Sequence, residues 1–184
     1  MPFAAVLDAS VLYPLPLRDT LLRIAEAELY DAYWSERILD EVARNLIADG
    51  RASKHQARRL TTTMNKAFDG AAVPQEAVDR LEPAMTNHTK DRHVLAAAVA
   101  SDAQAIVTLN LKDFQIEACE PFAIEPLHPD AFLIDLYHLD ADAVLEAVER
   151  QAAVLCRPPM TLHELLNRLT ATVPDFAETL RHHR

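Results

Sequence analysis

The sequence predicts an α/β fold with a mainly parallel sheet, followed by a C-terminal α-helical extension. Up to about Pro126, short apolar segments alternate with segments of helical periodicity, an order typical of parallel strands joined by helices. After Pro129 only helical patterns follow. We therefore expect two parts, residues 1–128 and residues 129–184. The 184 residues, 50% of them apolar, are enough for a sizeable core.

The elements of the first part follow from apolar periodicity and from residues that begin or end helices. Short apolar segments predict strands at 4–7, 30–34, 105–109 and 122–125. Apolar residues at helical spacing predict helices at 17–29, 35–47, 53–68, 77–81 and 94–100. Ser35 is a suitable N-cap, and Gly50 and Gly70 are suitable helix ends.

The second part contains four helical patterns, at 130–137, 141–155, 162–171 and 174–182. Pro158 and Pro159 separate the middle two, and Asp140 and Thr161 are suitable N-caps. We expect the apolar positions of these helices to pack onto the first part or onto each other rather than form a partner groove. These positions are Leu133, Ile134, Leu145, Val148, Leu165 and Leu169.

Composition excludes several classes of protein. The only two glycines rule out glycine-rich nucleotide-binding loops, and a net charge of −10 counts against a general polyanion binder. A cluster of basic residues is more simply a solvated helix face than a phosphate-binding patch; it consists of Arg44, Arg51, Lys54, Arg58, Arg59 and Lys66. We expect no membrane span, no secretory signal and no zinc site, and the isolated Cys119 and Cys156 suggest a reduced, cytoplasmic protein.

Several polar residues are expected at one edge of the sheet. Asp8 follows the first strand, while Asn110 follows the strand at 105–109, with Asp113 three residues later. Asp91 begins the helix before that strand, and Glu41 lies one position off the apolar stripe of its helix. Because ligands bind outside the carboxyl ends of the strands in open α/β sheets, we expect these side chains to meet.

Such a cluster of carboxylates predicts a divalent cation. Each acid alone has a simpler explanation, as a helix cap, a turn residue or a solvated side chain. Together they would repel one another, and Mg²⁺ or Mn²⁺, which prefer oxygen ligands, would relieve the repulsion. Such a cation can activate water and stabilise the displacement of a phosphoryl group.

Neighbouring polar residues give no competing mechanism. His93 is expected to point away from Asp91, and no sequence motif supports a Ser–His–Asp triad. Thr108 is by default an ordinary strand residue that could assist the site.

Four stretches of the chain resemble a PIN-domain nuclease. They are VLDASVL (6–12), SERILDEVARNL (35–46), KDRHVLAAAVASDAQAIVTLN (90–110) and LKDF (111–114). Their order and spacing, over about residues 3–126, are more specific than any one of them. Within that family the chain is most similar to VapC-type toxins of bacterial toxin–antitoxin pairs, in a version with a C-terminal helical extension.

The resemblance implies a three-layer α/β/α sandwich with an acidic pocket that binds Mg²⁺ or Mn²⁺. By position it assigns Asp8, Glu41 and Asp91 as catalytic residues and metal ligands, with Ser10 as a supporting hydroxyl. The family's fourth acid falls on Asn110 here, and Asp113 is near enough to replace it. Both alternatives stay open at this point.

The implied function is a metal-dependent endoribonuclease that hydrolyses RNA phosphodiester bonds as the toxin of a type II toxin–antitoxin system. Its partners would be an RNA substrate and a cognate antitoxin protein encoded beside it. The alternatives are a non-catalytic RNA- or protein-binding module and a housekeeping RNA-processing nuclease without an antitoxin. The helical extension could also serve as a homodimer surface, an antitoxin dock or a guide for the substrate.

Overall fold

The computed structural model describes residues 3–154 and 160–183 and is built around a parallel sheet. Within that range the sheet has five strands in the order β3-β2-β1-β4-β5, and every neighbouring pair is parallel. The strands are β1 (Ala4–Leu7), β2 (Asp31–Ser35), β3 (Ala72–Val73), β4 (Ala105–Val107) and β5 (Glu125–Leu127). The prediction of a mainly parallel sheet is confirmed.

Two strand predictions were wrong at the sheet edges. β3 was not predicted, because its two residues pair only with Trp34 and Ser35 and form no apolar run. The strand expected at 122–125 begins only at Glu125. Phe122 instead ends a short 3₁₀ helix, and Ala123 follows in the left-handed conformation at φ 53°.

The helices of the first part are close to the predicted ones. They are α1 (Ala9–Leu12), α2 (Leu15–Glu26), α3 (Glu36–Ala48), α4 (Lys54–Ala67), α5 (Gln75–Leu81), α6 (Arg92–Ala100) and α7 (Ile116–Cys119). Ser35 caps α3 by accepting a hydrogen bond from the Ile38 amide, as predicted. α2 ends before the predicted residue 29, because Glu28 takes a left-handed φ of 61°. The single-turn helices α1 and α7 were missed since four residues give no periodicity.

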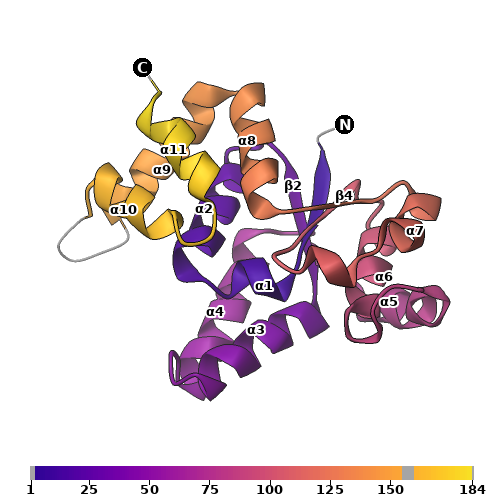
Figure 1. The fold of residues 1–184 in the computed structure, drawn as a ribbon. Coiled ribbons are helices and arrows are strands. Elements are labelled where there is room, and N and C mark those ends of the chain that lie inside the picture. The colour runs from indigo at the N-terminus through magenta and orange to yellow at the C-terminus, as the bar shows by residue number, and fades with distance from the viewer. Residues whose placement is uncertain (1–2, 155–159, 184) are drawn as a thin grey trace.

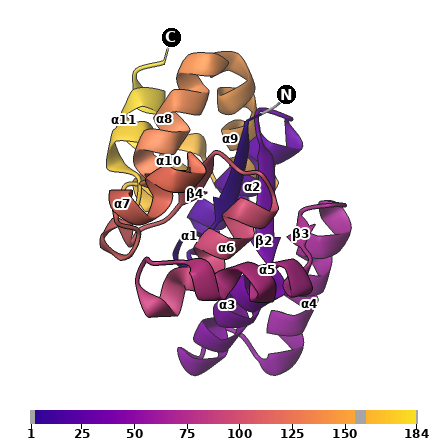
Figure 2. The same ribbon diagram turned by 90° about the vertical axis from the view of Figure 1, so that its right-hand side faces the viewer.

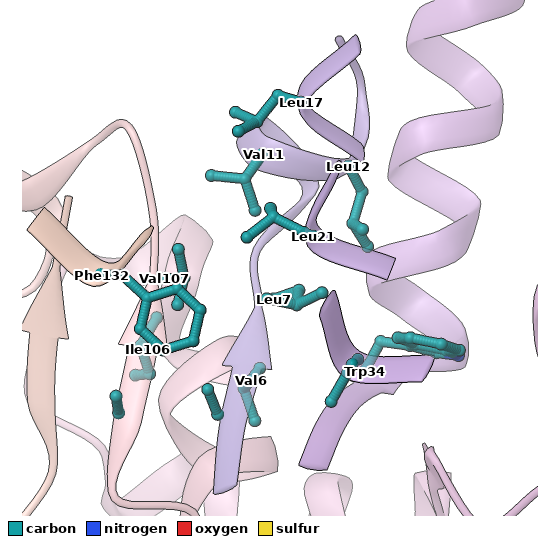
Figure 3. Close-up of a cluster of buried hydrophobic side chains, with 14 of the residues drawn as sticks. Val6, Leu7, Val11, Leu12, Leu17, Leu21, Trp34, Ile106, Val107 and Phe132 are labelled. Carbon is teal, nitrogen blue, oxygen red and sulfur yellow. The ribbon is translucent and has the colours of Figure 1, made fainter. Parts of the chain in front are cut away.

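The helices form layers on the two faces of the sheet. In both ribbon views, α5 and α6 lie on one face and α2 lies on the other, together with the C-terminal helices (Figures 1 and 2). The predicted three-layer sandwich is confirmed. Side chains of β1, β4, α1 and α2 form one buried cluster, which Phe132 of the C-terminal part joins (Figure 3).

The C-terminal part consists of α8 (Pro129–Leu139), α9 (Ala141–Val154), α10 (Leu162–Leu169) and α11 (Pro174–Arg181). Leu133, Val148, Leu165 and Leu169 are fully buried, and Ile134 and Leu145 are partly buried against the same core. The prediction that these apolar positions pack as core is confirmed. The prediction for Pro158 and Pro159 lies outside the described residues.

Buried hydrogen bonds fasten the C-terminal helices to the rest of the molecule and to each other. Gln151 of α9 accepts a hydrogen bond from Thr20 of α2 and donates one to the Pro16 carbonyl. Asp130 of α8 accepts the Asp175 and Phe176 amides at 3.0 and 2.8 Å and so caps α11. These contacts join the extension to α2 as part of one continuous core.

Two expectations about composition can be followed in the structure. None of the helices in residues 3–154 and 160–183 is long and apolar enough to cross a membrane. Cys119 is buried as a free thiol. Cys156 lies outside the described residues.

Candidate active site

Asp8 lies at the carboxyl end of β1, held by hydroxyl groups. Its Oδ2 accepts hydrogen bonds from Ser10 Oγ at 2.6 Å and Thr108 Oγ1 at 2.8 Å. Its Oδ1 accepts the Ala9 amide at 2.8 Å, so the side chain also caps the short helix α1. Asp8 is only 4% exposed. A buried carboxylate at this position is tolerated because its oxygens have donors.

The two hydroxyls also link the ends of β1 and β4. Ser10 Oγ accepts the Leu109 amide, and Thr108 Oγ1 accepts the Asn110 amide, both at 3.0 Å. Each hydroxyl therefore donates to Asp8 while it fixes the backbone that follows β4. Thr108 does more than an ordinary strand residue, and Ser10 makes the contact with Asp8 that the resemblance implied.

A cleft of about 590 Å³ opens beside this corner. Four of the five predicted site residues line it, and Asp8 lies buried next to them. The lining comes from α3 and from the segment between residues 88 and 113: Arg37, Glu41, Arg44, Asn45, His88, Lys90, Asp91, His93, Asn110, Lys112 and Asp113. The expectation that these polar side chains meet at the sheet edge is confirmed.

The structure places Asp113 close to Asp91. One ligand atom each of His88, Asp91 and Asp113 lies within 4.8 Å of the others. Asn110 also lines the cleft, and its carbonyl accepts the Asp113 amide at 2.9 Å. Asp113 thus adds a second carboxylate beside Asp91, while the Asn110 carbonyl is hydrogen-bonded within the turn.

Repulsion between carboxylates in the cleft contributes to the raised pKa values of Asp91 and Glu41. Burial, followed by the negative charges of Asp8, Asp113 and Glu41, raises the pKa of Asp91 from 3.8 to about 6. Burial and Asp8 also raise the pKa of Glu41, against the lowering effect of nearby arginines and Lys90. Asp91 occupies the N-cap position of α6 without capping it through its side chain. The simple explanation of Asp91 as a helix cap is therefore wrong.

His93 was expected to point elsewhere than Asp91, and sequence reasoning did not include it in the site. His93 lines the cleft, is 2% exposed, and has Nε2 4.0 Å from a carboxylate oxygen of Glu41. Burial and the charges of Arg37 and Arg44 lower the pKa of His93 to about 4, so the ring is neutral at pH 7. The residue lies two positions after Asp91, about half a helical turn, and so faces Glu41 of α3.

Three of the four cations that line the cleft, Arg37, Lys90 and Lys112, were also missed by sequence reasoning. Arg37 and Arg44 lie four residues before and three residues after Glu41, a spacing that places side chains on one face of a helix. Lys90 and Lys112 directly precede Asp91 and Asp113. Those spacings were the available signal. Of the six clustered basic residues singled out from the sequence, Arg44 lines this cleft.

The residues of the cleft fit a divalent cation. Asp91, Asp113 and Glu41 offer carboxylate oxygens, the ligands that Mg²⁺ and Mn²⁺ accept. The raised pKa values of Asp91 and Glu41 and the repulsion between the carboxylates are what a bound cation relieves. Asp8 is already hydrogen-bonded by two hydroxyls and an amide, which orients it and leaves less of it free for direct coordination.

Comparison with models of protein families assigns the chain to a family. Residues 4–112, more than half of the chain, match a family model described as a PIN domain. The chain belongs to the PIN-domain family. Residues 129–182 match a second model, described as the VapC50 C-terminal domain. The predicted PIN domain with a VapC-type helical extension is thus confirmed.

One curated relative of this PIN-domain chain comes from Mycobacterium tuberculosis and is named "Putative ribonuclease VapC50". The two are 47% identical over 98 residues, which cover 53% of this chain and 58% of that protein. The match thus spans little more than half of the relative's length. No solved structure matches the chain.

Proposed function

We propose that this PIN-domain protein is a metal-dependent endoribonuclease. The observation that carries the proposal is the meeting of Glu41, Asp91 and Asp113 in one cleft with Asp8 behind them. The name of the M. tuberculosis relative, a ribonuclease, supports the same chemistry. The reaction is hydrolysis of an RNA phosphodiester bond.

Each acid has a distinct part in the proposed site. Asp91 and Asp113 would hold the cation, Mg²⁺ or Mn²⁺, and Glu41 lines the same cleft from α3. Asp8 adds negative charge in a position fixed by Ser10 and Thr108. When bound, a divalent cation supplies activation of water and stabilisation of charge in phosphoryl displacement.

The cations of the cleft explain how a chain of net charge −10 would hold RNA. Arg44, Lys90 and Lys112 line the cleft and form no ion pair with another described residue. Arg37 differs, since it makes two hydrogen bonds to the Glu82 carboxylate. The three unpaired cations would contact the phosphates on either side of the bond that is cut, which positions the strand without reading its sequence.

We also propose that the protein is the toxin of a toxin–antitoxin pair and works in the cytoplasm. The match of residues 129–182 to the VapC50 C-terminal domain supports this assignment. Residues 1–128 would form the nuclease domain and residues 129–184 the extension. The antitoxin is a protein partner encoded beside the toxin, and a homodimer stays a prediction that light scattering on the purified protein tests.

The first experiment is cleavage of a pool of structured RNAs with Mg²⁺, with Mn²⁺ or with EDTA. The wild type is compared with Asp8→Asn and Asp91→Asn, and Asp40→Asn is the control, an exposed acid of α3 beside Glu41. We expect cleavage that needs the cation, persists in the control and is lost in both site variants.

Absence of cleavage by the folded wild type with either cation would contradict the nuclease and favour the non-catalytic binding module. Cleavage without growth arrest on expression, or growth arrest that no product of a neighbouring gene relieves, would favour the housekeeping nuclease over the toxin.

A further inference from the structure

His88 belongs to the acidic cluster, although sequence analysis did not include it among the site residues. Its Nδ1 lies 3.6 Å from a carboxylate oxygen of Asp91, and Asp113 offers a third ligand atom within 4.8 Å of both. The side chain is about half exposed and lines the cleft. A ring nitrogen therefore stands beside two carboxylates in the pocket that the proposed function needs.

Main-chain hydrogen bonds hold the three residues together independently of their side chains. The His88 amide donates to the Asp113 carbonyl at 3.2 Å, and the Asp91 amide donates to the His88 carbonyl at 2.9 Å. The buried Asn87 side chain adds a hydrogen bond to the same Asp113 carbonyl at 3.4 Å. The backbone thus joins two segments that are more than twenty residues apart in the sequence, and it fixes the position of the His88 main chain.

The wall of the cleft provides a second, independent observation. His93 is 2% exposed and lines the cleft, yet its Nδ1 has no hydrogen-bond partner in the described part of the chain. Buried polar atoms are nearly always paired, so the unpaired nitrogen of a residue that lines the cleft points to a polar or charged ligand.

We propose that His88 Nδ1 is the third protein ligand of the cation, beside Asp91 and Asp113, and that it makes the site prefer Mn²⁺ to Mg²⁺. The inference rests on the proposed function, because it concerns the same site. Mg²⁺ is usually bound by one or two carboxylates and several waters. An imidazole suits the transition metals instead and adds to their affinity.

The test is the binding of Mn²⁺ and Mg²⁺ to the full chain, without RNA. Pulsed electron paramagnetic resonance on bound Mn²⁺ detects a directly coordinated ¹⁴N, and competition titrations give the affinities for both cations. The wild type is compared with His88→Ala, and His55→Ala is the control, an exposed histidine of α4 outside the cleft.

We expect the ¹⁴N signal in the wild type and in the control, and its loss in His88→Ala. The Mn²⁺ affinity should fall at least about tenfold in His88→Ala, since even outer partners of a ligand are worth that much. The Mg²⁺ affinity should change much less, so that the preference for Mn²⁺ collapses. Circular dichroism confirms folding, which an exposed side chain should not disturb.

Three results would overturn the inference: a wild type that binds no Mn²⁺ or shows no ¹⁴N signal, a signal that survives in His88→Ala and disappears in His93→Asn, or equal losses for both cations. RNA cleavage is scored separately. A protein that binds Mn²⁺ through His88 but cuts no RNA would leave this inference standing while the proposed function fails. A nuclease without nitrogen coordination would do the reverse.

Discussion

The cleft and the junction of the C-terminal helices differ in how their polar side chains are hydrogen-bonded. At the junction, Asp130 accepts two backbone amides, and Gln151 is bonded on both sides of its amide. In the cleft, Asp91 caps nothing with its side chain, and the buried His93 has an unpaired ring nitrogen. Both regions contain carboxylates at helix N-termini, and in the cleft neighbouring negative charges help to raise the pKa of Asp91.

This difference separates polar groups that stabilise the fold from polar groups that reduce its stability. A paired buried carboxylate contributes to stability, whereas neighbouring unpaired carboxylates reduce it. Substitution should therefore affect stability at the junction and activity at the cleft.

The largest effect is expected for Asp91→Asn. This substitution removes a charge from the cleft and keeps the size of the side chain, so RNA cleavage should fall by about 100- to 1,000-fold, as for other groups that stabilise charge in a transition state. The free energy of unfolding should stay the same or rise, because one repelling charge is lost. Cleavage assays and urea denaturation measure the two quantities. A clear loss of stability would show that Asp91 has a structural role.

The next largest effect is expected at the junction, for Asp130→Ala. Two backbone amides at the start of α11 lose a charged acceptor, and hydrogen bonds to charged groups contribute about 1.5–3 kcal/mol each. We expect the free energy of unfolding to fall by about 3 kcal/mol, with cleavage by the remaining folded protein unchanged. Asp135→Ala, at an exposed position of the same helix, is the matched control. Equal destabilisation by both variants would refute the capping role of Asp130.

Sequence reasoning predicted the overall fold, including the C-terminal helices, better than the contacts within the cleft. Parallel strands, most helices and the buried face of the extension follow from periodicity, because packing selects for it. The strand at Glu125 was misplaced because a left-handed residue, Ala123, delays it, and periodicity does not report backbone angles. The two-residue strand β3 exists only through pairing with β2, which a local pattern cannot show.

The acids of the cleft were predicted from their positions after strands and on the neighbouring helices, yet their contacts were not. Asp8 lies next to Thr108 across a hundred residues of sequence, and His88 reaches Asp113 through the backbone of another segment. Such contacts depend on how the strand ends align. His93 was not included in the site, because two positions along a helix turn a side chain to the other face. Glu41 of α3 lies on that side, and both residues line the cleft.

A smaller effect is expected for Thr108→Val, which keeps the shape of the side chain and removes the hydroxyl that orients Asp8. Cleavage and cation affinity should fall by about 10-fold, the lower end of the range for partners outside the metal ligands themselves. Thr108→Ser restores the hydroxyl and should recover most of the loss. If Thr108→Val and Thr108→Ser were equally impaired, packing of the methyl group and not the hydrogen bond would be responsible.

A smaller effect still concerns pH and the protein without cation. The raised pKa of Asp91, about 6 against 3.8, means that the folded state holds a proton that the unfolded state has lost between about pH 4 and pH 6. In EDTA the unfolding free energy should therefore fall as the pH rises through this window, and Asp91→Asn should lack that component. Urea denaturation at several pH values measures it. An identical pH profile in the variant would contradict the assignment.

The smallest effect is expected for Arg44→Gln. Arg44 lines the cleft, whereas Arg58 of α4 is exposed elsewhere and serves as the matched control. Measured in an Asp91→Asn background to prevent cleavage, RNA affinity should weaken a few-fold in Arg44→Gln. The slope of log affinity against log salt should decrease by about 0.7, the value for one phosphate contact on a single strand. Arg58→Gln should change neither quantity. If instead Arg58→Gln lowered the slope and Arg44→Gln did not, RNA would bind along the basic face of α4, and the cations of the cleft would serve only to balance its acids.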